Sequence, residues 1–116
     1  TRLDMLCAVL SRRGGIFLGD KDVFVNVVGG VTITDPSIDL AVCAAIKSAV
    51  KDKALEKESI YFGEVGLTGE IRGTWGMESV LSEASRVGYT CAYIGNFSVK
   101  SKKKISTTIV RNIKSL

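Results

Sequence analysis

The sequence predicts a single α/β (α+β) domain in which about three helices pack on a mixed sheet. Three observations lead to this prediction. The 116 residues are 46% hydrophobic with one proline, which suits one core. Segments with apolar residues at helical spacing alternate with short β-branched segments. No internal repeat or low-complexity linker divides the chain. We therefore expect residues 1–116 to form one domain.

The first elements are expected to be a helix and several short strands. Apolar residues at helical spacing over residues 3–10, followed by Gly14-Gly15, predict an amphipathic helix of about three turns. Residues 16–18 and 23–28 are predicted strands because they are apolar and largely β-branched or aromatic. Residues 31–34 alternate apolar and polar side chains. Together with 23–28 they predict a β-hairpin or a bulged strand pair.

A central helix is expected next. Asp35 followed by Pro36 is a helix start signal, because the aspartate can cap free amide groups and proline suits the first helical turn. The helix should run from Pro36 to about Lys51. Its small apolar side chains predict that it packs against a sheet, with lysines at its solvent-exposed end.

Five further elements complete the predicted fold. Their apolar patterns match strand and helix periods, and glycines or polar turns separate them. Gly63, Gly66 and Gly69 are expected to serve tight turns. The predicted elements are strands at residues 59–65, 70–72, 90–94 and 105–110 and a helix at 79–86, which brings the expected strands to six or more.

Composition excludes several classes of site. The chain has no histidine, so chemistry that needs imidazole is excluded, and no paired CxxC offers a zinc site. Cys7, Cys43 and Cys91 lie far apart in apolar stretches, which favours reduced thiols and a cytoplasmic location. No apolar run approaches the ~20 residues that span a bilayer, and no secretory signal pattern is recognisable, so we expect no membrane contact.

Positive charge is concentrated at the C-terminal end. Six of the 16 Lys and Arg residues lie in residues 100–116, where no acidic residue occurs. Contact with a phosphate backbone requires several cations more than it requires a fixed geometry. The candidate nucleic-acid-binding residues are Lys100, Lys102, Lys103 and Lys104. A solvated charge run is the alternative interpretation.

Three motifs occur in a specific order: VFVNVVGGVTITDPSIDLAV, YFGEVGLTGEIR and SEASRVGY. In wording and spacing the chain resembles the C-terminal Lon protease-like domain of bacterial RadA/Sms DNA repair proteins. The resemblance implies an upstream zinc-binding module and a RecA-like, DNA-dependent ATPase. Neither is present here, since no GxxxxGK[ST] motif occurs. ATP, Mg and Zn are therefore expected only in those upstream domains, with no cofactor or metal in this one.

The resemblance also locates a degenerate peptidase site. Lon peptidases use a serine–lysine dyad, and the match puts Ser37 at the serine and Glu78 at the lysine. A glutamate is a weak base toward a serine hydroxyl. Asp35 and Asp39 flank Ser37, and their negative charge would oppose an oxyanion. We therefore expect no catalytic residue, with Ser37 and Asp39 as parts of a capped helix start, and the resemblance implies that Asp39 also fixes the turn by hydrogen bonding to a partner that the sequence does not identify.

A serine peptidase of Lon type that uses Ser37 with another lysine is the alternative. The candidate bases are Lys47 and Lys51. Lys47 is ten residues along the same predicted helix, about 15 Å away at 1.5 Å per residue, which argues against this alternative.

Five other side chains have structural interpretations. Glu64 and Glu70 are expected to form ion pairs with Arg72 or a neighbouring subunit rather than an acid–base pair. Trp75 is expected to anchor packing or a subunit contact. Tyr89 and Tyr93 belong to or flank a predicted strand and are expected in the core rather than as stacking platforms.

The resemblance therefore implies an inactive protease homologue that acts as a scaffold. It would support a ring, hexameric in the full-length protein, and contact single-stranded or branched DNA during branch migration in homologous recombination. Recombinase-type partners would fit this role. A pure oligomerisation module without a DNA role is a third interpretation.

Overall fold

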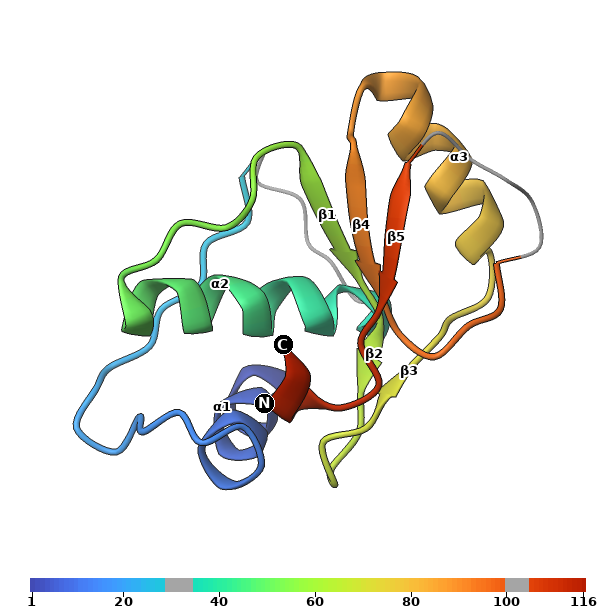
Figure 1. Cartoon of the computed structure of the whole chain (residues 1–116). Coiled ribbons are helices and arrows are strands. Elements are labelled where there is room, and N and C mark those ends of the chain that lie inside the picture. Colours follow the sequence, from blue (N-terminus) through green and yellow to red (C-terminus); the bar gives the residue numbers. More distant parts are fainter. Residues whose placement is uncertain (29–34, 100–104) are drawn as a thin grey trace.

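The computed structural model describes residues 1–28, 35–99 and 105–116 (Figure 1). Three α-helices and five short strands alternate along these residues, so the predicted α/β class is confirmed. In chain order the elements are α1 (Arg2–Arg12), the 3-10 turn η1 (Pro36–Ile38), α2 (Asp39–Lys51), β1 (Ser59–Phe62), β2 (Glu64–Val65), β3 (Ile71–Arg72), α3 (Met77–Val87), β4 (Cys91–Ile94), β5 (Ser106–Ile109) and the 3-10 turn η2 (Ile113–Ser115).

The main sheet has three parallel strands in the order β1-β4-β5. The strands β2 and β3 form a separate antiparallel pair in which Glu64 faces Arg72 and Val65 faces Ile71. The predicted mixture of parallel and antiparallel pairing is thus confirmed. In Figure 1, α3 lies on one side of the main sheet, whereas α1 and α2 lie on the other.

The two faces of the main sheet carry different side chains because successive residues of a strand point to opposite faces. Ala92 and Ile94 of β4 are buried with Leu81 of α3. Tyr61 and Tyr93 point to the other face and pack at the edge of the cluster formed by α1 and α2. This second face is only half covered, since both tyrosines remain partly exposed.

The helices begin and end where the sequence indicates. Thr1 and Asp4 form a capping box at the start of α1. The Asp35 side chain caps η1, whose first residue is Pro36, and η1 continues directly into α2. α3 ends at Gly88, which adopts a positive φ of 109°.

Two predicted strands in the first part of the chain do not form. Residues 16–18 and 23–28 contain no strand, and residues 31–34, the second half of the expected hairpin, lie outside the described residues. Ile16 is buried in the core without strand pairing, whereas Phe24 is 91% exposed. β-branched sequence favours an extended backbone, but a strand also needs a paired neighbour, and local sequence does not supply one.

The predicted strand at residues 59–65 is interrupted at Gly63. The Gly63 amide donates to the Ser37 carbonyl at 2.8 Å, and its carbonyl accepts from the Leu40 amide at 3.0 Å. A Cβ atom at this position would lie 2.9 Å from Ile71 Cγ2, so only glycine allows this approach. The break therefore connects the sheet to the start of α2.

The expected packing roles of two aromatic residues are wrong. Trp75 is 100% exposed, so it anchors no packing within the described chain. Tyr89 is 42% exposed and lies between the end of α3 and β4 rather than in the core. A subunit contact by Trp75 stays a prediction.

Candidate functional site

Ser37 lies in the η1 turn that leads into α2. Its amide donates to the Asp35 carboxylate at 2.9 Å, and this backbone hydrogen bond lowers the pKa of Asp35. The residue is only 2% exposed, and among the described residues its Oγ makes no well-formed hydrogen bond, although the Ser37 side chain also helps to lower the pKa of the Asp35 carboxylate. A nucleophilic serine needs a well-aligned base and access to substrate, and among the described residues Ser37 has neither in this arrangement.

Asp39, in the first turn of α2, is the most buried charged side chain near Ser37. It is 0% exposed and accepts hydrogen bonds from both Arg2 Nε, at 2.8 Å, and Arg2 Nη2. The Val65 amide donates to the same carboxylate at 3.1 Å. The expected hydrogen bonding by Asp39 is confirmed, and it joins α1, α2 and β2 at one point.

Arg2 is the partner that sequence reasoning missed. It lies 37 residues from Asp39, and no local pattern links the two positions. The hydrogen bond to Asp39 raises the pKa of the guanidinium, so Arg2 stays charged. The Arg2 side chain is 47% exposed, whereas that of Asp39 is 1% exposed, so only one side of this bidentate pair is accessible to water.

A line of alternating charges continues from Arg2 over the β2–β3 pair. Glu64 lies 3.5 Å from Arg2 and 3.8 Å from Arg72, and Arg72 also contacts Glu70 at 2.8 Å. Hydrogen bonds from the Thr68 hydroxyl and from Arg72 lower the pKa of Glu70 to about 2. The expected ion pairing of both glutamates with Arg72 is therefore confirmed, and Glu70 is an ion-pair acceptor rather than a proton donor at neutral pH.

The other residues of the predicted sites are not brought to Ser37. Glu78 lies in the first turn of α3, where a carboxylate complements the helix dipole, and it makes no hydrogen bond to Ser37 Oγ. Lys47 and Lys51 line a cavity beside Tyr61 at the other end of α2. The lysines at 100 and 102–104 lie outside the described residues.

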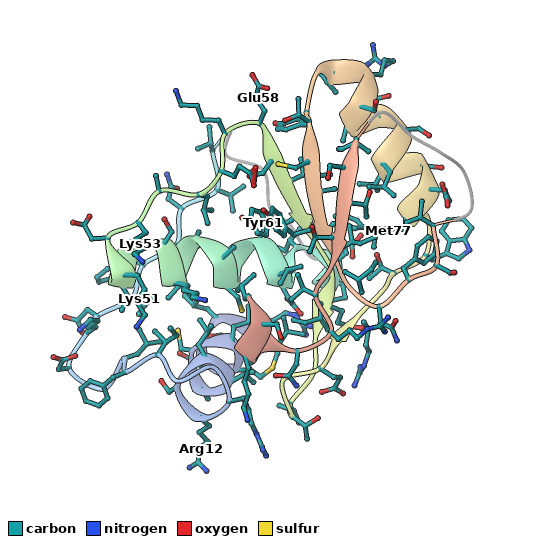
Figure 2. All side chains as sticks on the ribbon, in the orientation of Figure 1. Arg12, Lys51, Lys53, Glu58, Tyr61 and Met77 are labelled. Atoms are coloured by element: carbon teal, nitrogen blue, oxygen red, sulfur yellow. The ribbon has the colours of Figure 1, made fainter. Side chains whose placement is uncertain are left out.

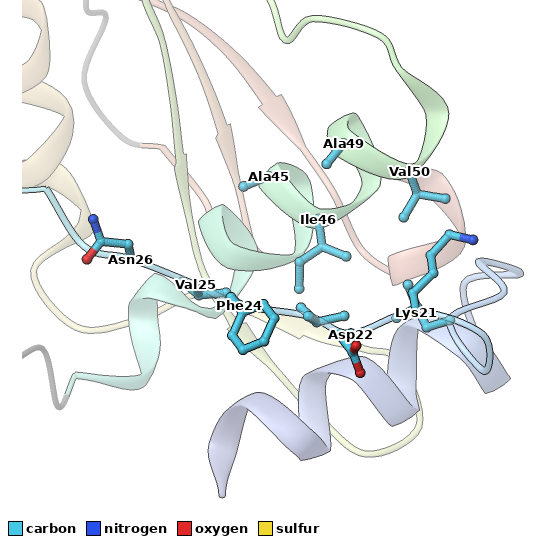
Figure 3. A pocket seen from close by; sticks show the side chains of 11 residues that line it. Lys21, Asp22, Phe24, Val25, Asn26, Ala45, Ile46, Ala49 and Val50 are labelled. Atoms are coloured by element: carbon cyan, nitrogen blue, oxygen red, sulfur yellow. The ribbon is translucent and has the colours of Figure 1, made fainter.

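A separate hollow of about 630 Å³ lies between α2 and the extended segment at residues 18–26 (Figure 3). Its lining is mainly aliphatic and aromatic and includes Phe24, Ile46 and Ala49. Lys21 at this hollow is ion-paired with Asp20 at 2.9 Å. The hollow therefore presents mainly apolar surface, with Lys21, Asp22 and Asn26 as its polar residues.

Cysteine and metal chemistry find little support in the described part of the chain. All three cysteines are free, and burial raises the pKa of the Cys43 thiol to about 12, which keeps it protonated. Among the described residues, no group of three or more His, Cys, Asp or Glu side chains could hold a metal ion. Within the same residues, no helix is long and apolar enough to cross a bilayer.

Comparison with a family model extends over most of the chain. The family described as "ChlI: Subunit ChlI of Mg-chelatase" matches residues 8–97. This range includes α2, the strands β1 to β4 and α3, whereas β5 lies beyond it. It also includes the Ser37–Asp39 turn and the Tyr61–Tyr93 pair.

Several bacterial proteins named DNA repair protein RadA are similar to the chain. The Salmonella typhimurium protein is 46% identical over 101 residues, which is 87% of this chain and 22% of that protein. The Haemophilus influenzae protein is 42% identical over 115 residues, 99% of the chain and 25% of that protein. The Aquifex aeolicus protein is 46% identical over 93 residues, 80% of the chain and 21% of that protein. The chain thus spans only about a quarter or less of the length of these relatives.

Proposed function

This chain belongs to the ChlI domain family and is homologous to part of the DNA repair protein RadA, and on that premise we propose that it is a non-catalytic scaffold domain of a RadA-type protein. In this proposal the domain is Lon protease-like and inactive as a peptidase. Within the full-length ATPase it supports a homo-oligomeric, hexameric ring and contacts single-stranded or branched DNA for branch migration. It acts in the cytoplasm, and recombinase-type proteins are its partners.

The single observation that carries the inactive assignment is the burial of the Ser37 hydroxyl, which makes no well-formed hydrogen bond among the described residues, beside an ion-paired aspartate. Asp39 accepts three hydrogen bonds from Arg2 and Val65, so it holds the fold together and is not available as a base. Asp35, whose pKa is lowered, adds a second negative charge next to Ser37. An oxyanion formed at this turn would face carboxylates instead of hydrogen-bond donors.

Exposed apolar side chains support the assembly part of the proposal. Trp75 is fully exposed and Leu67 is 72% exposed, on the turns that flank β3. Tryptophan is enriched in the buried centres of protein interfaces, and its complete exposure in a lone chain is unfavourable. A neighbouring copy in a ring would cover these side chains.

The DNA part of the proposal rests on the basic tail and on the relatives. Four lysines between residues 100 and 104 supply closely spaced positive charge. The relatives are named DNA repair proteins. Neutralising phosphates with lysines releases counterions, so binding should weaken steeply as salt rises.

The peptidase alternative is tested with a labelled unfolded protein substrate. We expect no cleavage by the wild-type chain, by Ser37→Ala or by Glu78→Lys, since a lysine at position 78 would still meet a buried hydroxyl. Cleavage by the wild type that disappears in Ser37→Ala would overturn the inactive assignment.

Assembly and DNA binding are tested separately. Light scattering should show that Trp75→Ala reduces self-association in a RadA-type protein that contains this domain. Fluorescence anisotropy should show weak, salt-dependent binding of single-stranded DNA by the chain, lost when Lys102, Lys103 and Lys104 are changed to glutamate. Unchanged binding in that variant would favour an oligomerisation module whose tail has no role.

A further inference from the structure

A second cavity lies on the half-covered face of the main sheet and has not entered the proposed function. It has a volume of about 720 Å³, within the range of small-molecule sites. One wall is the C-terminal part of α2 and the residues after it, and the other is the sheet face that carries Tyr61 and Tyr93. Figure 2 shows Lys51 and Lys53 at the end of α2 and Tyr61 above the helix.

The two tyrosine rings form a stack that runs across the strands. Tyr61 of β1 is in register with Tyr93 of β4, and their ring centroids are 4.7 Å apart with an interplanar angle of 9°. This separation is close to the distance of about 4.8 Å between neighbouring strands. Each strand therefore supplies one ring of a ladder.

On β5, the position next to Tyr93 carries no aromatic ring that would continue this stack. Thr108 of β5 is in register with Tyr93 and is exposed. β5 lies about one strand spacing beyond β4, so the space above Thr108 has the thickness of one aromatic ring. A threonine side chain is too short to cover the ring face of Tyr93. A planar ring from a ligand could occupy this place and extend the stack.

Tyr93 is held in position for such stacking. Its hydroxyl donates to Glu56 Oε1 at 2.6 Å, and this hydrogen bond raises the pKa of the phenol to about 12. The ring is thus neutral and oriented from both ends, by the Tyr61 stack and by Glu56. A held ring loses little conformational freedom when a ligand stacks on it.

The charge of the cavity selects an anionic ligand. Lys47, Lys51 and Lys53 line it; no Asp or Glu among the described residues does, and the Glu56 carboxylate beside Tyr93 is hydrogen-bonded to the Tyr93 hydroxyl. Lys47 donates to the backbone carbonyl of Leu116, whereas Lys51 and Lys53 are exposed. Two cations beside an open aromatic face match a ligand that joins a planar ring to a phosphate.

We propose that this cavity binds a nucleotide, with its base stacked on Tyr93 above Thr108 and its phosphate at Lys51 and Lys53. This site is proposed from described residues alone, and it does not rest on DNA contact by the lysines at 100–104. Both a free mononucleotide and one nucleotide unit of a single strand have the required chemistry.

The test titrates the 116-residue chain with deoxyadenosine monophosphate and, in a second arm, with an oligodeoxyadenylate. NMR should show ring-current shifts of the Tyr93 and Thr108 resonances. Thr108→Phe fills the open place with the chain's own ring and should weaken binding about tenfold or more. The matched control is Ser106→Phe, which adds the same ring to the same face of β5 opposite Cys91 and should leave affinity unchanged.

Lys51→Glu provides a second measurement and should weaken both probes several-fold without changing the fold seen by circular dichroism. Binding of the mononucleotide identifies a free nucleotide as sufficient. Binding of the oligonucleotide alone, with the same loss in Thr108→Phe, identifies a single strand as the source. The proposal is wrong if neither probe shifts Tyr93 and Thr108, or if Thr108→Phe binds as tightly as the wild type.

Discussion

The Arg2–Asp39 pair should respond unequally to removal of its two partners. Arg2→Met leaves a carboxylate that is 0% exposed with one remaining donor, the Val65 amide. Breaking a buried pair in this direction costs about 3–5 kcal/mol, because water does not reach the unpaired charge. Asp39→Asn leaves a guanidinium whose side chain is 47% exposed and can rehydrate. Its expected cost is about 1.5–3 kcal/mol, the range for hydrogen bonds to charged groups.

Urea denaturation followed by circular dichroism measures both costs. With a denaturant slope of about 2 kcal/mol/M, Arg2→Met should lower the midpoint by about 2 M and Asp39→Asn by about 1 M. Arg12→Met is the matched control, since Arg12 is an exposed arginine at the other end of α1 (Figure 2). It should change the free energy of unfolding by no more than about 0.5 kcal/mol.

Two outcomes would refute this reasoning. If Arg2→Met were no more destabilising than Arg12→Met, the Arg2–Asp39 pair would not stabilise the fold. If Asp39→Asn were the more destabilising variant, exposure of the guanidinium would not determine the cost.

Three further predictions concern single side chains. Thr68→Val should raise the pKa of Glu70 from about 2 toward its usual value of 4.5, as measured by NMR titration. Because this pKa is lowered in the folded state, the contribution of Glu70 to stability is fully present above pH 4.5 and is lost as the pH falls toward 2. Glu56→Gln should lower the pKa of Tyr93 from about 12 toward 10 in an ultraviolet difference titration, and an unchanged value would exclude Glu56 as its cause. Leu81→Ala should cost about 2–5 kcal/mol in urea denaturation, since the side chain is 0% exposed, and a cost under 1 kcal/mol would contradict its place in the core.

Helices were the most predictable part of this fold. The expected helices at residues 3–10, 36–51 and 79–86 agree with α1, η1 plus α2, and α3 within a few residues at their ends. Their signals are local: apolar residues three and four apart, a capping aspartate, and a glycine after the last turn. The strands at 90–94 and 105–110 were also correctly placed, because short apolar segments bounded by turns are local signals too.

The strand predictions were wrong where strand pairing depends on contacts with other segments of the chain. Residues 23–28 have strong strand propensity and yet form no strand, and the segment at 59–65 is divided at Gly63. Propensity describes one segment, whereas a strand needs a second segment at hydrogen-bond distance. The division at Gly63 arises from its close approach to Ile71 and from its bonds to the start of α2.

The residues of the candidate site were also predictable only in part. The sequence alone identified Ser37 as a helix-start residue with Asp35 as its cap, and it identified Asp39 as a hydrogen-bonding residue. It could not identify Arg2 as the partner of Asp39, because 37 residues separate them. The Tyr61–Tyr93 stack was also missed. Period-two alternation indicates which face of its own strand each tyrosine occupies, so a partial signal was present in the sequence.

The sequence by itself determined the α/β class, the three helices, the capped turn at Ser37 and the concentration of positive charge after residue 99. These properties depend on composition and on contacts within one turn or one strand, so they can be recognised without coordinates. Only the tertiary structure decided that Arg2 meets Asp39, that Ser37 is buried without a well-aligned base among the described residues, and that Tyr61, Tyr93 and three lysines share one cavity. Those outcomes depend on which distant segments pack together, and local propensity does not encode that choice.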